Sequence, residues 1–174
     1  MGPSSVTSSY EIRLAGRDDA EAITQMLANL ADAMGDGAVF ASTPEIIHRY
    51  GFMADALFSV MIAEDAGLSL FFPHFSTTRG QPGVYVQDLW VSPAVRGQNL
   101  GTRLLAATAA YATQSWGAGY MALTTHGHNE TARRFYRDLG FMVAGDDTPM
   151  HLTGSKYQSL GEKLTEESNL AKGQ

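Results

Sequence analysis

The stretch that decides the fold runs from Val84 to Gly101 and reads VYVQDLWVSPAVRGQNLG. Its first part, residues 84–91, is mostly apolar, which predicts a strand near the centre of a sheet. An Arg-Gly turn follows, and an Ala-rich amphipathic run over residues 99–116 then predicts a long helix. Backbone N–H groups at a helix start lack helical partners and lie at the positive end of the helix dipole, so this segment predicts an anion site. The spacing alone is also compatible with a strand-to-helix loop that binds no ligand.

The residues on either side of this stretch follow strand and helix patterns in turn. Apolar positions recur with a period of two or of about 3.6 residues, and turns rich in Gly, Pro and Asp separate the segments. The predicted strands cover 10–14, 58–64, 68–75, 84–91, 120–125, 141–144 and 150–152, and the predicted helices cover 17–30, 43–57, 99–116 and 129–139. This order predicts an α/β fold with a mixed sheet in one domain over residues 10–160, between a Ser/Thr-rich tail at 1–9 and a polar tail at 161–174.

The composition is that of an ordinary globular domain. The 174 residues are 44% hydrophobic and 17% charged, which suffices for one core. The chain has no cysteine, which excludes disulfides, thiolate metal sites and a catalytic thiol, and fits a cytoplasmic protein. No apolar run approaches the roughly 20 residues of a membrane span, and the first residues lack the pattern of a signal peptide. We therefore expect no membrane partner.

The acidic residues are concentrated in the first half of the chain. The net charge is −6, and residues 1–87 carry 4 Lys or Arg against 10 Asp or Glu, whereas residues 88–174 carry 8 of each kind. This distribution argues against general nucleic-acid binding, which requires a larger basic face. Between Arg96 and Arg137, five arginines accompany a single acid, Glu130, so a locally basic surface is available to an anion.

Two motifs give the chain a resemblance to a known family. Arg96, Asn99 and Gly101 occupy the three defining places of R/Q-x-x-G-x-G/A, the coenzyme A signature of the GNAT superfamily of N-acetyltransferases. Residues 129–141, NETARRFYRDLGF, resemble the N-x-x-A-x-x-F-Y-x-x-x-G-F of the same family. The resemblance covers roughly residues 10–157 and is strongest over 84–144. Asn99 departs from the usual glycine, but Asn tolerates left-handed backbone angles better than most residues, so we expect the turn to survive.

The resemblance implies a GNAT-like three-layer α/β fold. Its sheet would be mixed and mostly antiparallel, with helices on both faces and a splayed parallel strand pair at 84–91 and 120–125. Acetyl-CoA, as co-substrate, would lie between these two strands, and no metal is implied. The first strand would contact the pantetheine arm and the thioester through its backbone, the helix start would hold the diphosphate, and the second motif would line the pantetheine and the sulfur. The implied cofactor-binding residues are Leu89, Trp90, Val91, Arg96, Gly97, Gln98, Asn99, Leu100, Gly101, Thr102, Asn129, Arg133 and Tyr136.

The reaction implied by the resemblance needs a base, because an alkyl ammonium with a pKa of about 10.4 cannot attack a thioester. Asp88 is the carboxylate nearest the reacting centre by sequence and is the first candidate, with His126, His128 or a water relay as alternatives. The position of Asp88 is also compatible with a purely structural carboxylate that bonds to neighbouring backbone. The positions of the two histidines are also compatible with exposed loop residues that have no catalytic role. The family position of Tyr136 implies that its phenol is the general acid that protonates the departing thiolate.

The resemblance defines the acceptor amine less closely than it defines the acetyl donor. The chain most resembles the branch of diamine, polyamine and thialysine acetyltransferases, which implies direct attack by a small cationic primary amine bound by Gln87, Asp88 and His126. Gln87 stands where that branch has Glu. The acidic residues Asp55, Glu64 and Asp65, expected near the substrate loops, still favour a cation. An acetyltransferase for an amino acid, an antibiotic or a protein N-terminus is the alternative, as is a CoA-binding module without catalysis. The same branch implies a homodimer.

Overall fold

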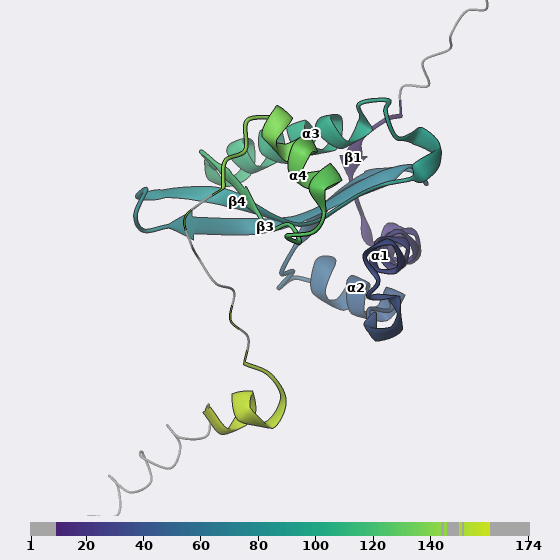
Figure 1. The fold of residues 1–174 in the computed structure, drawn as a ribbon. Helices are drawn as coiled ribbons and strands as arrows, with labels where there is room; N and C mark the ends of the chain where they lie inside the picture. The colour runs from purple at the N-terminus through teal and green to yellow at the C-terminus, as the bar shows by residue number, and fades with distance from the viewer. Residues whose placement is uncertain (1–9, 144, 146–149, 151, 161–174) are drawn as a thin grey trace, which may run out of the picture. The chain divides into compact units, whose positions relative to one another are not determined.

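The computed structural model describes residues 10–143, 145, 150 and 152–160 (Figure 1). By its internal contacts the chain divides into two compact units, of which the first ends at Arg133 and the second begins at Arg134. The first unit contains the sheet and most of the helices. Each unit is described by itself below.

The first unit is organised around a five-stranded sheet with the strand order β1-β2-β3-β4-β5. Neighbouring strands from β1 to β4 are antiparallel, whereas β4 and β5 are parallel. The strands are β1 (Arg13–Leu14), β2 (Ser59–Ala63), β3 (Gly67–Ser76), β4 (Gln81–Val91) and β5 (Met121–Leu123). The sheet is therefore mixed and mostly antiparallel, and its one described parallel pair joins the two predicted strands, as expected.

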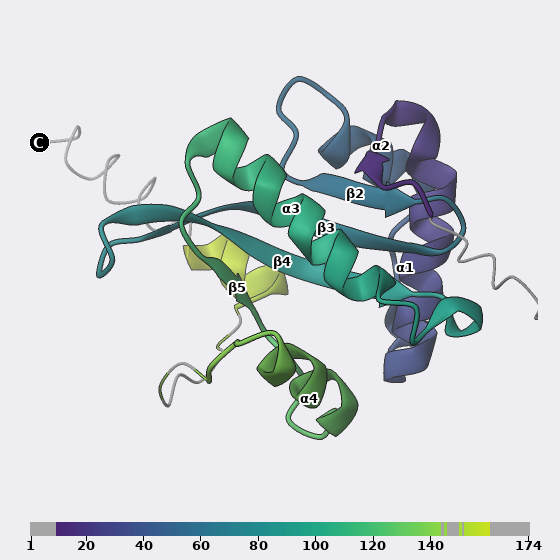
Figure 2. The same ribbon diagram turned by 90° about the horizontal axis from the view of Figure 1, so that it is seen from above.

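Helices cover both faces of this sheet, which confirms the predicted three layers. The helix α3 lies across one face, and α1 and α2 lie on the other (Figures 1 and 2). The helices are α1 (Ala20–Met34), α2 (Pro44–Gly51), α3 (Leu100–Trp116) and α4 (Glu130–Asp138), with short 3-10 turns η1 (Arg17–Asp19), η2 (Gly37–Val39) and η3 (Pro93–Val95). The start of α2 follows the predicted pattern, because the Thr43 hydroxyl accepts a hydrogen bond from the Ile46 N–H at 3.3 Å and Pro44 occupies the first helical position.

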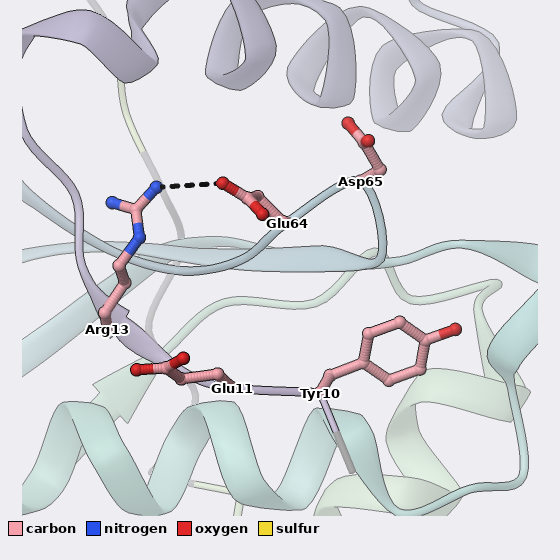
Figure 3. Close-up of a pocket in the computed structure, with 5 residues that line it drawn as sticks. All are labelled: Tyr10, Glu11, Arg13, Glu64 and Asp65. Atoms are coloured by element: carbon pink, nitrogen blue, oxygen red, sulfur yellow. Dashed lines mark ion pairs between the residues drawn. The ribbon is translucent and has the colours of Figure 1, made fainter. Parts of the chain in front are cut away.

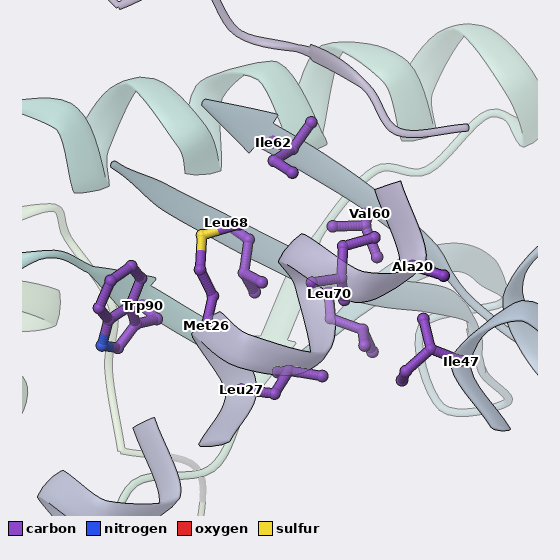
Figure 4. Close-up of a cluster of buried hydrophobic side chains, with 10 residues drawn as sticks. Ala20, Met26, Leu27, Ile47, Val60, Ile62, Leu68, Leu70 and Trp90 are labelled. Carbon is purple, nitrogen blue, oxygen red and sulfur yellow. The ribbon is translucent and has the colours of Figure 1, made fainter. Parts of the chain in front are cut away.

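A hydrophobic core joins α1 and α2 to the sheet. Leu68 and Leu70 on β3 point toward this layer, together with Trp90 on β4, and all three are buried. The whole cluster consists of Ala20, Ile23, Met26, Leu27, Ile47, Val60, Ile62, Leu68, Leu70 and Trp90 (Figure 4). Leu68 and Trp90 are cross-strand partners, so this pair fixes which face of β4 meets α1.

A second set of contacts joins the opposite face of the sheet to α3. Phe71 is fully buried and meets the Tyr111 ring edge-on, with 5.8 Å between centroids. The Thr108 hydroxyl donates a hydrogen bond of 3.0 Å to the Ser69 hydroxyl, and both residues are fully buried. The indole N–H of Trp116 donates to the Gly83 carbonyl at 2.9 Å. These contacts hold α3 in place along β3 and β4.

One extra residue in β4 changes the side on which its later side chains point. Val86 pairs with Phe71 and Asp88 pairs with Leu70, so Gln87 has no partner in β3 and forms a β-bulge. Without the bulge, strict alternation would direct the Asp88 side chain toward α3. With it, Asp88 shares the α1 face with its partner Leu70.

Several predicted elements are shorter than expected or absent. The first strand is reduced to Arg13–Leu14, the second helix ends at Gly51 rather than near residue 57, and residues 141–143 form no strand. The backbone N–H and C=O groups of a strand form hydrogen bonds with a neighbouring strand. No described strand lies beside residues 141–143. Met150 and Leu152 are likewise outside any strand, residues 154–160 are helical, and the two predicted tails lie outside the described residues. Among the described helices, none has both the length and the apolar character required to span a bilayer.

Candidate functional site

The segment from Arg96 to Thr102 forms a tight turn into α3. Gly97 has φ +81° and Asn99 has φ +61°, so the backbone takes left-handed angles twice within three residues. Asn99 thus adopts the conformation expected for the glycine that it replaces. The Arg96 side chain is tied down, because its Nε donates to the Val91 carbonyl at 3.2 Å. The turn that the sequence predicted is therefore present with Asn in place of Gly.

The start of α3 has the chemistry of an anion site. The first hydrogen bond of the helix runs from the Arg103 N–H to the Asn99 carbonyl at 3.1 Å, so the amides of residues 100–102 have no helical acceptor. A Cβ placed on Gly97 would meet no atom within 4 Å, which shows open space beside the turn. Residues 92–102 contain no carboxylate. The residues present therefore fit a diphosphate group.

β4 has an open edge next to this turn. The pairing of β4 with β5 ends at Val86 and Leu123, just before the bulge. No described strand pairs with residues 87–91 on that side, so this edge is open to a ligand, except that the Val91 carbonyl already accepts from Arg96. Leu89 and Val91 are half-buried, whereas the Trp90 side chain is buried in the α1 core, which leaves only its backbone for ligand contact.

Asp88 is the ionisable group closest to this edge. Its side chain is half-buried, and no described residue donates a hydrogen bond to it or forms an ion pair with it. Burial raises the pKa of Asp88 to about 6, because the charged form loses solvation. A carboxylate with such a pKa is ionised at pH 7 yet accepts a proton more readily than an exposed aspartate. Gln87, the bulge residue beside it, is exposed.

The loop that follows β5 is held by two of the predicted residues. The Asn129 side-chain carbonyl accepts a hydrogen bond from the Ala132 N–H at 3.1 Å, and its amide nitrogen lies 3.9 Å from the Met34 sulfur at the end of α1. Arg133 donates to the Gly127 carbonyl at 3.2 Å and pairs with Glu130 at 2.9 Å. In the structure both residues therefore stabilise the loop itself.

Two histidines of the same loop are exposed. The rings of His126 and His128 lie 5.6 Å apart, centroid to centroid. Among the described residues, no group of three or more His, Asp or Glu side chains gathers in a way that would hold a metal ion. Both histidines therefore lie at the surface of this loop.

Tyr136 belongs to the second unit. Its ring contacts Phe135 and Phe141, with centroids 5.1 Å and 5.4 Å away, and it is half-buried. Burial raises the pKa of the Tyr136 phenol to about 12. The phenol is therefore protonated throughout the neutral pH range, which is the state that a proton donor requires.

A surface hollow of about 330 Å³ lies at the start of β1, and none of the predicted catalytic or cofactor-binding residues lines it (Figure 3). Tyr10, Glu11, Arg13, Glu64 and Asp65 line it, and Arg13 pairs with Glu64 at 3.6 Å. Two of the three acids expected near substrate loops, Glu64 and Asp65, thus lie at the β2–β3 turn, whereas Asp55 pairs with Arg49 at 2.9 Å. That turn adjoins the far end of β4, where the Ser92 N–H donates to the Ala66 carbonyl at 2.8 Å.

Sequence reasoning missed a group of aromatic side chains on the α1 face of the sheet. Phe72 and His74 on β3, Tyr85 on β4 and Tyr120 just before β5 contact one another in series, and we call them the aromatic ladder. The signal was available in part, because Phe72 and His74 alternate with Pro73 on one strand. The contribution of Tyr120 could not be predicted from the sequence, because it depends on the pairing of β4 with β5.

Comparisons with known proteins identify a family and several relatives. A family model described as the acetyltransferase (GNAT) family matches residues 37–141, more than half of the chain. An L-ornithine N5-acetyltransferase of Arabidopsis thaliana is 30% identical over 112 residues, which are 64% of this chain and 47% of that protein, so the chain spans about half the length of this relative. A thialysine N-epsilon-acetyltransferase of Mus musculus is 27% identical over 145 residues, covering 76% of this chain and 84% of that protein.

Solved structures with low sequence identity share the fold. An integron cassette protein from the mobile metagenome of V. cholerae has a TM-score of 0.70 at 18% identity, covering 88% of this chain and 98% of its own. An aminoglycoside acetyltransferase from an uncultured soil metagenomic sample, in complex with sisomicin, has a TM-score of 0.67 at 16% identity, covering 83% and 95%. These likenesses concern the arrangement of helices and strands.

Proposed function

The chain belongs to the acetyltransferase (GNAT) family, and from that premise we propose that it transfers an acetyl group from acetyl-CoA to the nitrogen of a primary amine. The observation that carries the proposal is the open edge of β4 beside the uncapped start of α3. An extended arm could pair with the strand edge while its diphosphate accepts hydrogen bonds from the helix start. Acetyl-CoA has both an extended pantetheine arm and a diphosphate.

The residues proposed to hold acetyl-CoA are those of the turn and the open edge. The amides of residues 100–102 and the Arg96 side chain would hold the diphosphate, and Gly97 leaves space for it. The backbone of residues 89–91 would align the pantetheine arm. We keep Asn129 and Arg133 as candidates for the pantetheine side, although their side chains already have partners within the loop.

Asp88 is proposed to bind the acceptor ammonium and to take up its proton, directly or through a water. When bound, acetyl-CoA supplies an activated acetyl thioester. The neutral amine nitrogen forms a bond to the acetyl carbon, the carbon–sulfur bond breaks, and the thiolate leaves with its electron pair. The nitrogen then loses a second proton to water as the neutral amide forms. Tyr136 is proposed, from the family position alone, to return a proton to that sulfur. Its elevated pKa keeps the phenol in the protonated form before the transfer.

The acceptor proposed is a small cationic amine. The two curated relatives are named for ornithine and thialysine, both of which carry a side-chain amine. The unpaired carboxylate of Asp88 supports a cationic acceptor, and Gln87 and His126, the other proposed acceptor-binding residues, are both exposed. An antibiotic, another amino acid or a protein N-terminus remains the alternative acceptor, and a CoA-binding module without catalysis the alternative function.

We further propose a cytoplasmic homodimer. The absence of cysteine supports a reducing compartment. Large apolar side chains are exposed in the second unit, and they support an interface there; they include Leu139, Met142, Val143, Met150, Leu152, Tyr157 and Leu160. Light scattering coupled to size exclusion would give the mass of the particle, and a monomer mass at micromolar concentration would contradict the dimer.

The test of the proposed function is amine-dependent release of the CoA thiol. The protein is incubated with acetyl-CoA and, in turn, ornithine, thialysine, a diamine, an aminoglycoside and a peptide with a free N-terminus. We expect thiol release with at least one amine, matched by an acetylated product in mass spectra. Binding of acetyl-CoA without amine-dependent release would overturn the enzyme and favour the binding module.

The role of Tyr136 is tested by Tyr136→Phe, with Tyr157→Phe as the matched control on an exposed tyrosine of the second unit. We expect kcat to fall about 100-fold or more in the first variant, because general acid catalysis contributes about 10²–10⁴-fold. Acetyl-CoA affinity should stay the same in both variants. An unchanged kcat would remove Tyr136 as the acid while leaving the transferase intact.

A further inference from the structure

The aromatic ladder is an ordered surface rather than a collection of loose side chains. Phe72 and Tyr85 are stacked, with centroids 5.2 Å apart and planes at 24°. His74 lies 6.1 Å from Tyr85 and 5.7 Å from Tyr120, which it meets edge-on. Hydrogen bonds fix the polar ends, because His74 Nδ1 lies 2.5 Å from the Tyr120 hydroxyl and the Tyr85 hydroxyl lies 2.8 Å from that of Thr124.

The ladder begins next to Asp88 and leads away from it along the same face of the sheet. Asp88 is opposite Leu70, Tyr85 is opposite Phe72, and His74 is opposite Gly83. Successive residues on one face of a strand are about 6.7 Å apart, so the level of His74 lies roughly 13 Å from that of Asp88. The helices α1 and α2 pack over the half of the sheet that contains Leu70 and Trp90, away from the β3–β4 turn (Figure 1).

The two ends of the ladder carry opposite charges. At the far end, the Arg79 guanidinium lies 5.0 Å above the Tyr120 ring, and no described carboxylate pairs with it. Residues 66–87 and 117–129, which build this part of the sheet, contain no Asp or Glu at all. At the near end stands the Asp88 carboxylate, which no described cation neutralises. An acceptor lying along the ladder would thus meet an anion at one end and a cation at the other.

We propose that the ladder binds the body of the acceptor, with the reacting ammonium at Asp88 and an anionic group of the acceptor at Arg79. This inference rests on the proposed function and identifies the acceptor as a zwitterionic amine, such as an amino acid or peptide with a distal primary amine. Arg79 is then a specificity-determining residue, because its planar fork of donors matches a carboxylate. A diamine or polyamine is disfavoured, since its second ammonium would approach Arg79 and His74 with no carboxylate to receive it.

The test compares two series of simple acceptors that differ only at the distal end. The first consists of ω-amino acids of increasing chain length, and the second of n-alkylamines of the same lengths. We expect kcat/KM to be about five- to tenfold higher for the best ω-amino acid than for its alkylamine, as for one partly exposed charge-assisted contact. We expect the preference to depend on chain length and to be smallest for ω-amino acids too short to span the ladder.

Arg79→Gln should abolish that difference by raising KM for the ω-amino acids, while kcat/KM for the alkylamines stays the same. Arg17→Gln, which removes the same charge from the exposed turn η1, is the matched control and should preserve the difference. Tyr85→Leu, which keeps an apolar side chain but loses the stacked ring, should weaken both series alike.

The outcomes separate this inference from the function on which it rests. If kcat/KM for alkylamines and diamines is as high as for ω-amino acids, the proposed anion site is wrong. The proposed acetyltransferase activity is then unaffected. The same holds if Arg79→Gln leaves the carboxylate preference intact. Acetyl-CoA binding with no transfer to any amine, in these series or in the wider panel above, overturns the proposed function and the acceptor site with it.

Discussion

The Asp88 carboxylate is half-buried beside Trp90, with no donor among the described residues. Its folded pKa of about 6 lies above the value of about 3.9 for an unfolded aspartate, because burial penalises the charge. The folded state therefore binds more protons than the unfolded state between these two values. By linkage, ionisation of Asp88 destabilises the fold as the pH rises from about 4 through about 6.

Replacing this carboxylate should therefore stabilise the protein while removing activity. We expect Asp88→Asn to raise the free energy of unfolding by about 2 kcal/mol at pH 7.5, allowing for partial solvation, since each pKa unit is worth about 1.4 kcal/mol. At pH 4 the gain should be small, because Asp88 is then largely protonated. Urea unfolding at the two pH values measures both, with exposed Asp138→Asn as control. A loss of stability at pH 7.5 would contradict the burial argument.

The sequence predicted the structure correctly at single positions where the local backbone angles alone determine which residue types are tolerated. Asn99 was expected to accept the left-handed turn of the glycine that it replaces, and its φ is +61°. The sequence could not place the Asp88 side chain, because strand alternation predicts a face only while the register is unbroken. The bulge at Gln87 depends on how β3 and β4 pair, which no local pattern around Gln87 records.

At the scale of elements, the packing of α3 on β3 includes one buried polar pair. Ser69 and Thr108 are fully buried and share a hydrogen bond of 3.0 Å. We expect Thr108→Val to lower the free energy of unfolding by about 1–2 kcal/mol, because it leaves a buried hydroxyl without its donor. The double variant Ser69→Ala/Thr108→Val should recover much of this loss, since neither partner then remains unpaired. Equal losses in the single and double variants would contradict a coupled pair.

The predicted strand with a partner directly next to it in the sequence formed, whereas the strand predicted at residues 141–143 did not. The hairpin of β2 and β3 was predicted from a local turn and is present with only small shifts in its bounds. Residues 141–143 have strand-like composition but meet no neighbouring strand among the described residues. The aromatic ladder could not be predicted from local patterns, because it combines side chains of β3, β4 and the residue that precedes β5.

At the scale of the whole molecule, binding of acetyl-CoA should stabilise the fold as a unit. A ligand at 100 times its Kd adds about 2.7 kcal/mol to the free energy of unfolding. For a chain of this size, that corresponds to roughly 5–10 °C in Tm. An acetyl thioester that lacks the diphosphate should give a much smaller shift at the same concentration, because it cannot contact the start of α3. Equal shifts in a thermal scan would contradict the diphosphate site.

Gly83 has consequences for how this protein could change under selection. Trp116 bonds to its carbonyl from one side of the sheet, and the Tyr120 ring occupies the space where a Cβ would stand on the other. Any side chain at position 83 must therefore displace Tyr120, and with it the support beneath Arg79, while the turn at Asn99 lies elsewhere in the fold. A single codon could thus alter acceptor preference without touching donor binding. Substitution of this glycine during evolution would therefore change which acceptor amines related proteins use.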